Sequence, residues 1–489
     1  MTPFSFMAHP YDSEDRDASA TAEVALLDDA RRVSPSLDFE LINTPVSKSS
    51  TPLFVDHLRR SAKPASLWMT GLEFELFGYA AGDLQRLDAV EVQAVLLDLA
   101  ASSDDALFEE GIVAEVSTGA GGMDRVTVEP GGQIEFSGAP HRSLKGIEVS
   151  LGAHLARLSE IASQRGFKFL ATGFDPLRTI EEQRWFPKPR YSVMRPYLAT
   201  RGRRAWDMMC RTCAIQVNVD YGSEQDLAKK FVVGNRLAPF VTAMFAASPF
   251  ENGKLSGYKS TRAAVWLETD ADRASVSPLA LGDNFSLEAF VDYALAVPML
   301  FARRDGRYLD ETTGLRFSKF LDGVFLDGER ISLQPIFQDW TDHLTTIFTE
   351  ARLKQYIELR SADSNTAQMA LALQALWKGL MYDAYALDEA LRLAPKLSGE
   401  ETCELQEAVA REGLSARAGG VDVLRVAKDA IALAAEGLGR VASEEVKYLD
   451  ILRTQVIDEE ICPADILLRN WHGAWHQSME RVIEYLHIA

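Results

Sequence analysis

Carboxylates occur in two short segments of this chain, each with polar side chains two residues apart: Gly71–Gly78 (GLEFELFG) and Glu129–Phe136 (EPGGQIEF). Both segments have the residue types of β-strands, and side chains two positions apart on a strand lie on the same face. The resulting pairs are Glu73 with Glu75 and Gln133 with Glu135. Several carboxylates on one sheet face repel one another unless cations bind there, and such oxygen ligands suit Mg²⁺ held against phosphates. The pattern predicts a magnesium–phosphate site, and so an enzyme that uses ATP.

A third segment, Tyr356–Asp363 (YIELRSAD), extends this pattern with an acid and a cation. Glu358 joins the acidic set, and Arg360 follows two residues later on the same face of the expected strand. Arginine binds carboxylates and phosphates through two parallel hydrogen bonds. A single pair of acids is more often a solvated strand face, so the interpretation as a metal site depends on all three segments together.

Length, composition and charge limit the class of protein. The chain has 489 residues, of which 47% are hydrophobic, so it can bury a large core. Its formal net charge of -20 argues against nucleic acid or an anionic membrane surface as a partner. No stretch is long and apolar enough to span a bilayer, and the acidic N-terminus is unlike a signal peptide. With only four cysteines, we expect a cytoplasmic protein.

The order of patterns along the chain predicts an antiparallel-rich sheet with helices around it. We expect a polar, loosely structured N-terminal segment over 1–55, a catalytic α+β body over 56–365, and a mostly helical C-terminal part over 366–489 packed on that body. The first segment contains an expected helix at Thr21–Arg32 and a linker at Asn43–Pro52. The expected strands are Leu67–Tyr79, two within Val126–Phe136, Phe167–Ala171 and Cys213–Asp220.

The expected helices have apolar residues at helical spacing. Ser143 is a candidate N-cap for a long helix that Gly166 ends, and Ser398 with Glu401 suggests a capping box. The other expected helices are Ala89–Ala101, Lys229–Ala247, Ala367–Tyr385, Gly399–Glu412, Val421–Val441 and Ala464–Leu486.

Cys210 and Cys213 form a lone CxxC motif in what reads as a strand. One such pair does not complete a zinc site. Side chains three apart on a strand diverge, so we interpret the two as unrelated half-buried thiols, with a redox motif as the alternative.

The quoted blocks together resemble the plant-type glutamate–cysteine ligases, a group shared by plants and many proteobacteria. The resemblance runs in order from about Gly71 to the C-terminus, and it is far more specific than any single motif. Besides GLEFELFG, the blocks are EPGGQIEFSGAP (129–140), PKPRYSVMRPY (187–197), DMMCRTCAIQVNVDY (207–221), TRAAVWLETDADR (261–273) and DWTDHLTTIFTEARLKQYIELRSAD (339–363).

The resemblance implies an ATP-dependent carboxylate–amine ligase of the glutamine-synthetase-like fold, an α+β fold with a curved, mainly antiparallel sheet and helices outside it. In the implied reaction the γ-carboxylate of L-glutamate attacks the γ-phosphate of ATP, and the amine of L-cysteine then attacks the γ-glutamyl phosphate. The products are γ-glutamylcysteine, ADP and phosphate, in the first step of glutathione or related thiol synthesis. The implied partners are these small molecules and Mg²⁺, with the chain a monomer or homodimer.

The resemblance also assigns roles to individual side chains. Arg262 would hold the substrate glutamate carboxylate, and Arg360 would reach the transferred phosphate. The implied metal ligands are Glu73, Glu75, Glu129, Glu135, Glu358 and Gln216. The implied catalytic residues are Arg360, Arg262 and Gln216; further substrate contacts are Arg190, Arg195, Tyr191 and Leu300, and further ATP contacts are Lys188 and Gln133.

Two departures from the family pattern concern the acceptor. The family's VDYALDVPMYF is here VDYALAVPMLF, so Ala296 and Leu300 stand in place of an Asp and a Tyr. If Leu300 lines the acceptor pocket, the missing hydroxyl alters discrimination between amines. One alternative is therefore a ligase of the same mechanism with a non-cysteine acceptor. A second alternative, a non-catalytic paralogue, is disfavoured because it would have no reason to keep a costly acidic cluster.

Overall fold

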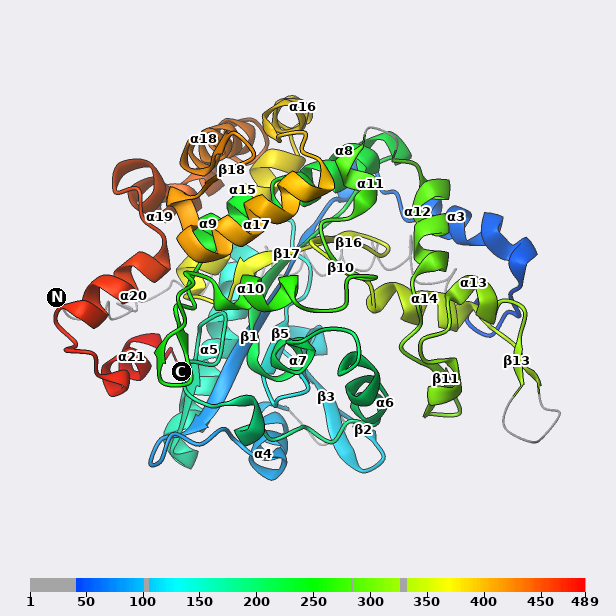
Figure 1. The fold of residues 1–489 in the computed structure, drawn as a ribbon, viewed down its shortest axis with the longest axis horizontal. Coiled ribbons are helices and arrows are strands. Elements are labelled where there is room, and N and C mark those ends of the chain that lie inside the picture. The colour runs from blue at the N-terminus through cyan, green and yellow to red at the C-terminus, as the bar shows by residue number, and fades with distance from the viewer. Residues whose placement is uncertain (1–40, 101–104, 283–284, 326–331, 489) are drawn as a thin grey trace.

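A computed structural model describes residues 41–100, 105–282, 285–325 and 332–488 of the chain (Figure 1). Its largest sheet has nine strands in the order β16-β17-β7-β1-β5-β4-β3-β2, with β6 also paired to β1. Every pairing in this sheet is antiparallel, which confirms the predicted fold class. The strands are β1 Thr70–Ala80, β2 Ala106–Glu109, β3 Ile112–Thr118, β4 Asp124–Val128, β5 Ile134–Ser137, β6 Phe167–Leu170, β7 Ala214–Val219, β16 Ala351–Leu353 and β17 Ile357–Asp363.

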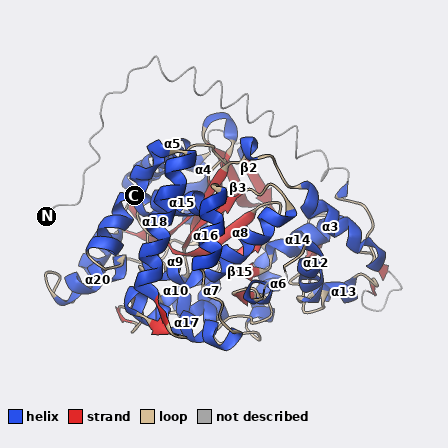
Figure 2. Ribbon diagram, turned by 90° about the horizontal axis from the view of Figure 1, so that it is seen from above, coloured by secondary structure: helices blue, strands red, loops and turns tan. Residues whose placement is uncertain are grey.

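Helices pack outside this sheet, and Figure 2 shows α8, α9, α15, α16 and α18 lying over it. The longer helices are α3 Thr51–Arg60, α4 Ala89–Leu99, α5 Leu144–Arg165, α6 Pro189–Leu198, α7 Ala205–Arg211, α8 Glu224–Arg236, α9 Ala238–Phe245, α10 Thr261–Leu267, α12 Leu287–Ala296, α14 Phe337–Thr345, α15 Ala367–Met381, α16 Ala384–Leu393, α17 Gly399–Glu412, α18 Val423–Val441, α20 Pro463–His472 and α21 Met479–Leu486. The short helices are α11 Pro278–Leu281, α13 Phe317–Phe320 and α19 Asp450–Leu452.

Short strand pairs lie outside the main sheet and brace connecting segments. They are β8 Phe250–Glu251 with β9 Lys254–Leu255, β10 Ala274–Ser275 with β15 Phe348–Thr349, β11 Ala302–Arg304 with β12 Arg307–Leu309, β13 Val324–Phe325 with β14 Ser332–Leu333, and β18 Arg417–Ala418 with β19 Val421–Asp422.

Alternation along the central strands separates an apolar face of the sheet from a polar one. On β7, Ile215, Val217 and Val219 are fully buried in the main hydrophobic core. The helix α15 packs against β1 and β7 and contributes to the same core. The side chains of Gln216 and Asn218 lie on the other face, which is therefore left for chemistry.

Several expected helix ends are confirmed by their capping groups. The Ser143 hydroxyl accepts from the Gly146 N–H at the start of α5, and Gly166 ends that helix at a φ of 71°. Ser398 and Glu401 form the predicted capping box of α17.

Other expected elements differ in the structure. Lys229–Ala247 contains two helices, because α8 ends at Arg236 and Pro239 stands in the first turn of α9. Ala464–Leu486 is likewise divided into α20 and α21. In the expected linker Asn43–Pro52, a 3₁₀ helix occupies Lys48–Ser50 and α3 begins at Thr51. The expected helix Thr21–Arg32 lies outside the described residues, and the division into three segments stays a prediction.

The CxxC motif spans two elements rather than one strand. Cys210 lies in α7, whereas Cys213 precedes β7, and both thiols are free and buried. Burial raises the pKa of both thiols well above the ordinary value, so neither is a reactive thiolate at neutral pH.

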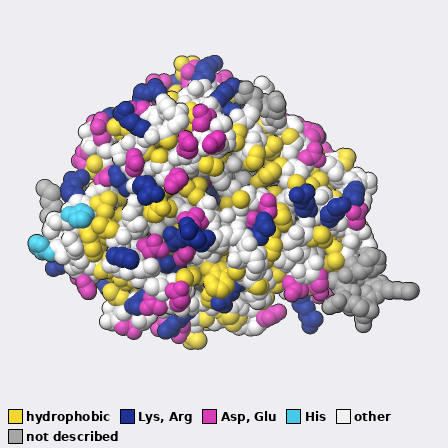
Figure 3. Space-filling view, viewed as in Figure 1, with side chains coloured by type: hydrophobic (Ala, Val, Ile, Leu, Met, Phe, Trp, Pro, Cys, Tyr) yellow, Lys and Arg dark blue, Asp and Glu magenta, His cyan; other side chains and the backbone are white. Residues whose placement is uncertain are grey.

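The helices and the surface charges can be compared with what a membrane or a nucleic acid would require. In the described part of the chain, no helix has both the length and the apolarity needed to cross a membrane. On the face seen in Figure 3, Lys and Arg side chains are interspersed with Asp and Glu.

Two glycines set the close packing of α15 on α18. A Cβ atom at Gly379 would lie 2.2 Å from the Ala434 carbonyl oxygen, and one at Gly437 would lie 2.0 Å from the Gly379 carbonyl oxygen. Both distances are far inside van der Waals contact, so the two backbones approach only because neither position has a side chain.

We expect Gly379→Ala to lower the free energy of unfolding by about 2–3 kcal/mol, because α15 and α18 must separate. The matched control is Gly152→Ala on the exposed face of α5, where a new Cβ meets nothing within 4 Å. That control should stabilise by up to about 1 kcal/mol through helix propensity. Urea unfolding measures both changes, and equal effects of the two substitutions would contradict the packing argument.

Candidate active site

A cavity of about 780 Å³ opens over the polar face of the sheet. Its lining combines side chains of β1, β4, β5, β7, β16 and β17 with residues of α6, α7 and α10. The predicted site residues that line it are Glu73, Glu75, Glu129, Gln133, Glu135, Lys188, Arg190, Tyr191, Gln216 and Arg360. The structure thus brings together residues that lie up to 287 positions apart in the chain, from Glu73 to Arg360.

The acidic side chains meet through the strand register. Glu75 on β1 lies directly opposite Glu135 on β5, and Glu73 lies opposite Gln216 on β7. Like charges directly opposite each other destabilise an antiparallel pair. Neutral donors offset part of this repulsion: the Ala214 N–H and the Gln216 amide donate to Glu75 at 2.8 and 3.1 Å.

Burial and crowding change the protonation of these acids. Burial, with the nearby charge of Glu129, raises the pKa of Glu75 to about 8. The pKa of Glu135 is raised well above its ordinary value by burial and by the charges of Glu129 and Glu73. A cation would relieve the same cost by pairing with the ionised carboxylates, so the chemistry of this donor set fits a hard cation such as Mg²⁺.

The oxygen atoms are not already arranged as a metal centre. Among the residues that the structure describes, no group of three or more His, Cys, Asp or Glu side chains is placed to hold an ion. Glu73 and Glu135 instead accept hydrogen bonds, from the Asn218 amide at 3.0 Å and the Thr127 hydroxyl at 2.8 Å. The magnesium site therefore stays a prediction.

Glu358 occupies a different environment from the other acids. Its side chain is fully buried, does not line the cavity, and pairs with Arg352, Lys354 and Arg360. Burial alone would raise its pKa, but the three neighbouring cations lower the pKa of Glu358 well below its ordinary value. The prediction that Glu358 belongs with the acids as a metal ligand is not supported by this geometry, because its charge is already compensated.

The three cations around Glu358 all line the cavity. Sequence reasoning identified Arg360 but missed Arg352 and Lys354. Their signal was present, because the two are spaced two residues apart like the acids and lie just before Glu358. Arg360 also stacks between two rings, with its guanidinium carbon 5.8 Å from the Trp266 centroid and 6.0 Å from that of Phe348.

Charge is therefore ordered across the sheet. The predicted acids other than Glu358 lie on or beside β4, β5 and β1, and the three cations around Glu358 lie on or beside β17 and β16. Arg190 also reaches the acidic side, where it pairs with Glu129 at 3.7 Å. On β7, between these two groups of strands, the Gln216 amide donates to Glu75 and its carbonyl oxygen accepts from Arg360. Gln216 thus joins the two sides rather than presenting its oxygen to a metal ion.

Some buried polar atoms in the cavity wall have no partner. They are Arg190 Nε, Asn218 Oδ1 and Trp266 Nε1. Leaving a buried donor or acceptor unpaired is costly, so a polar ligand in this cavity would be stabilised by completing these hydrogen bonds.

Three of the predicted substrate-contact positions lie outside the cavity lining. Arg195 stacks on Trp185 and Trp206, with its guanidinium carbon 4.2 and 5.0 Å from the ring centroids. Leu300 is only 1% exposed and packs in an apolar cluster that includes Val265. The positions of Arg195 and Leu300 result from packing between distant segments, which cannot be predicted from residue spacing.

Arg262 is the third, and its side chain is buried beside β17, where its charge still acts on Glu75. It is 5% exposed, its Nη2 donates to the Arg360 carbonyl at 2.6 Å, and its Nη1 lies 4.0 Å from Asp363 Oδ1. The predicted contact between Arg262 and a substrate carboxylate remains a prediction.

Comparisons with known proteins identify the family of this chain. The family model described as glutamate–cysteine ligase family 2 matches residues 69–485. The chain belongs to this family. The chloroplastic glutamate–cysteine ligase of Solanum lycopersicum is 36% identical over 454 residues, covering 92% of this chain and 85% of the relative. That of Brassica juncea is 38% identical over 437 residues, covering 88% and 83%. The membership confirms the resemblance carried by the sequence blocks.

A solved structure supports the fold. The glutamate–cysteine ligase of Francisella tularensis, solved in complex with AMP, superposes with a TM-score of 0.52 at 14% identity, covering 86% of this chain and 87% of that one.

The relatives also correct one expectation. The prediction of a cytoplasmic protein is contradicted, because the matching plant ligases are named as chloroplastic enzymes. Cysteine usage reports the redox conditions of a compartment, not which compartment it is.

The crowded acids make stability depend on pH in the absence of metal. Glu75 keeps its proton up to about pH 8 in the folded protein, whereas in the unfolded chain it loses the proton near its ordinary pKa of 4.5. The folded state binds more protons between these values, so its stability falls as pH rises through this window.

We expect Glu75→Gln to remove part of this dependence and to stabilise the metal-free protein at pH 8.5 by on the order of 1–3 kcal/mol. Thermal unfolding from pH 5 to pH 9 in the presence of a chelator measures how the stability of each protein depends on pH. The control is Glu407→Gln on the surface, which should leave the slope unchanged. A wild-type protein that becomes more stable from pH 5 to pH 8 would show that Glu75 is ionised throughout.

Proposed function

We propose that this protein is an ATP-dependent ligase that joins the γ-carboxylate of L-glutamate to the amine of L-cysteine. The observation that carries the proposal is the family match across residues 69–485, to relatives named for this reaction. The cavity supports it independently, because Glu73, Glu75 and Glu135 on β1 and β5 share one polar sheet face with the cations Arg352 and Arg360 on β16 and β17.

The reaction needs a leaving group, since a carboxylate is a poor electrophile. Phosphorylation by ATP supplies one as γ-glutamyl phosphate, and the amine then displaces phosphate. Such phosphoryl transfer depends on positioning and charge neutralisation rather than on a protein nucleophile. This agrees with a cavity rich in fixed charges.

The acidic side of the cavity would hold Mg²⁺ through Glu73, Glu75, Glu129 and Glu135. When bound, that ion neutralises phosphate charge and so favours transfer. The protein's own contribution is to gather these carboxylates by strand register, with neutral donors on β7 limiting their repulsion.

The basic side would receive the ATP phosphates. Arg360, Arg352 and Lys354 are held by one buried carboxylate, so their positive charges are ordered before any substrate arrives. Donors fixed in advance stabilise developing charge without reorganisation during the reaction. In this assignment Glu358 positions the cations.

Neither of the two residues that suggested a different acceptor lines the cavity. Ala296 is exposed at the end of α12. Leu300 is buried directly behind the lining, in the same apolar cluster as Met208 and Phe301. The apolar part of the cavity wall contains Met194, Met208 and Phe301, which suit a small thiol side chain. Cysteine is therefore the acceptor that we propose.

The first test is phosphate release from ATP with Mg²⁺, L-glutamate and a panel of amino acids and amines, with products identified by mass. We expect strong preference for L-cysteine and formation of γ-glutamylcysteine. Preference for another amine would leave the ligase mechanism in place but reject L-cysteine as the acceptor. No phosphate release with any amine would support a non-catalytic protein.

A second test concerns the basic side. We expect Lys354→Met to raise the KM for ATP by about tenfold or more, because a charge-assisted contact to phosphate is lost. The KM for glutamate should change less than about twofold. The control is Lys229→Met, which breaks a half-exposed ion pair with Asp388 and should leave both constants unchanged. An unaltered KM for ATP in Lys354→Met would place the phosphates elsewhere.

A further inference from the structure

The turn that carries Glu129, residues 128–133, is fixed by groups from distant parts of the chain. Glu129 lies where β4 ends, so its side chain reaches the cavity only if this turn keeps its shape. Three of the turn's carbonyl oxygens accept hydrogen bonds from outside the turn. The Val128 carbonyl accepts from Lys188 Nζ at 3.1 Å and from the Tyr191 hydroxyl at 2.7 Å. The Pro130 carbonyl accepts from the Phe186 N–H at 2.7 Å, and the Gly131 carbonyl accepts from Arg86 Nη2 at 2.8 Å.

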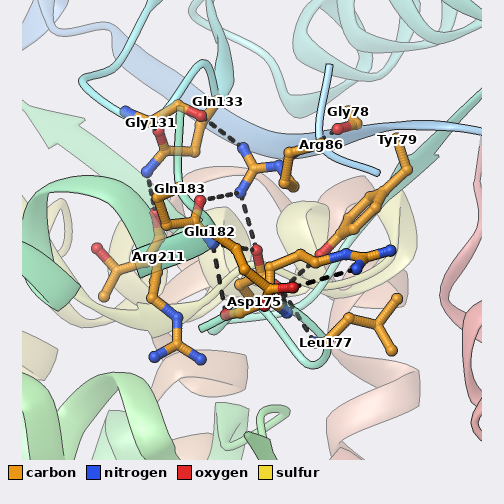
Figure 4. A network of polar contacts seen from close by, with 12 residues as sticks. Gly78, Tyr79, Arg86, Gly131, Gln133, Asp175, Leu177, Glu182, Gln183 and Arg211 are labelled. Atoms are coloured by element: carbon orange, nitrogen blue, oxygen red, sulfur yellow. Dashed lines mark hydrogen bonds and ion pairs between the residues drawn. The ribbon is translucent and has the colours of Figure 1, made fainter. Parts of the chain in front are cut away.

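Arg86 makes the contact from behind the turn (Figure 4). Its guanidinium is 3% exposed and donates to the Gly78 carbonyl at 3.2 Å and to Asp175 at 3.0 Å, besides Gly131. The guanidinium also stacks on Phe77, with its carbon 4.7 Å from the ring centroid. One planar group therefore ties the turn to β1 and to the segment after β6.

Arg86 is itself held in place by a buried network around Asp175 (Figure 4). The Tyr79 hydroxyl and the Gln183 amide donate to the Asp175 carboxylate at 2.6 and 3.0 Å. Burial opposes the charge, but Arg86 and Arg211 lower the pKa of Asp175 below its ordinary value. Several hydrogen bonds to one buried carboxylate permit few alternative positions for Arg86.

The other side of the turn is closed as well. A Cβ atom at Gly131 would lie 2.3 Å from the Cys210 carbonyl oxygen, so the turn already touches α7. Gln133 donates to the carbonyl oxygens of Met209 and Thr212 at 3.2 and 3.0 Å and accepts from the Gly131 N–H. The Gln133 amide is thus occupied by backbone groups, and no donor of it is left for ATP.

We propose that Arg86, Lys188 and Tyr191 are positioning residues, which hold the backbone of the Glu129 turn so that Glu129 faces Glu75 and Glu135 across the cavity. The inference rests on the proposed function for the meaning of that acidic set. It also replaces the roles predicted for Lys188 and Tyr191, whose polar ends donate to the Val128 carbonyl.

The test compares Arg86→Lys with a matched control, Arg236→Lys. Lysine keeps the charge beside Asp175, but its single ammonium does not replace a guanidinium that donates to four partners, Gly78, Gly131, Asp175 and Gln183. Arg236 is 6% exposed and likewise donates to backbone carbonyls, those of Ala280, Leu281 and Gly282, and it does not line the cavity. Both variants should lose similar stability, so any difference at the acids is specific.

Electron paramagnetic resonance measures Mn²⁺ binding to the protein in the absence of nucleotide and amino acid. Displacement of the bound Mn²⁺ by Mg²⁺ shows that both ions use the same site. We expect the Mn²⁺ dissociation constant to rise about tenfold or more in Arg86→Lys and to stay unchanged in Arg236→Lys. The Mg²⁺ concentration needed for half-maximal turnover should rise in parallel. Equal Mn²⁺ affinity in the two variants would overturn the proposal and leave Arg86 a purely structural residue.

A second variant covers the case in which Arg86→Lys does not fold. Lys188→Met keeps the length of the side chain and removes only its donor to the Val128 carbonyl, so we expect a weaker loss of Mn²⁺ affinity, about threefold or more. Unchanged Mn²⁺ affinity in Lys188→Met would contradict the proposal. Because Mn²⁺ binding is measured without substrates, failure of the proposed ligase activity in the wild type is a separate result.

Discussion

The mutual repulsion of carboxylates buried on one sheet face is the constraint on which the rest of the site depends. Glu75 and Glu135 face each other across neighbouring strands, and burial raises the pKa of both. No fold retains such a pair without compensation, because like charges oppose each other most strongly where water is excluded. Protons compensate them in the metal-free state, and a bound cation would do so in the proposed reaction.

The strand order turns this local problem into an organised site. Acids lie toward β4, β5 and β1, cations toward β17 and β16, and the amide of Gln216 joins the two groups. Glu358 shows how the same residue type is used differently on the two sides. Glu358 has three cations around it, which lower its pKa and keep it ionised. Burial, with the nearby charge of Glu129, raises the pKa of Glu75, so that it holds its proton.

The apolar face of the sheet makes this arrangement rigid. β7 buries its valines and isoleucine against α15, which in turn meets α18 through the paired glycines. Behind the acidic side, Arg86 and Asp175 fix the turn that carries Glu129. The geometry of the polar face is therefore held in place by elements that do not line the cavity, as a preorganised site requires.

The sequence by itself determined the elements and the residue types of the site. Period-two alternation identified β1, β5 and β7, and capping residues located α5 and α17. Spacing put Glu73 on one face with Glu75, and Glu358 on one face with Arg360. These signals are local, so they survive without knowledge of the fold. Only the tertiary structure decided which distant groups meet: that Glu358 is enclosed by Arg352 and Lys354, that Leu300 is buried with Met208 and Phe301 behind the cavity lining, and that Lys188 and Tyr191 donate to a backbone carbonyl. Such pairings depend on strand order and on packing between segments far apart in the chain, which residue spacing does not encode.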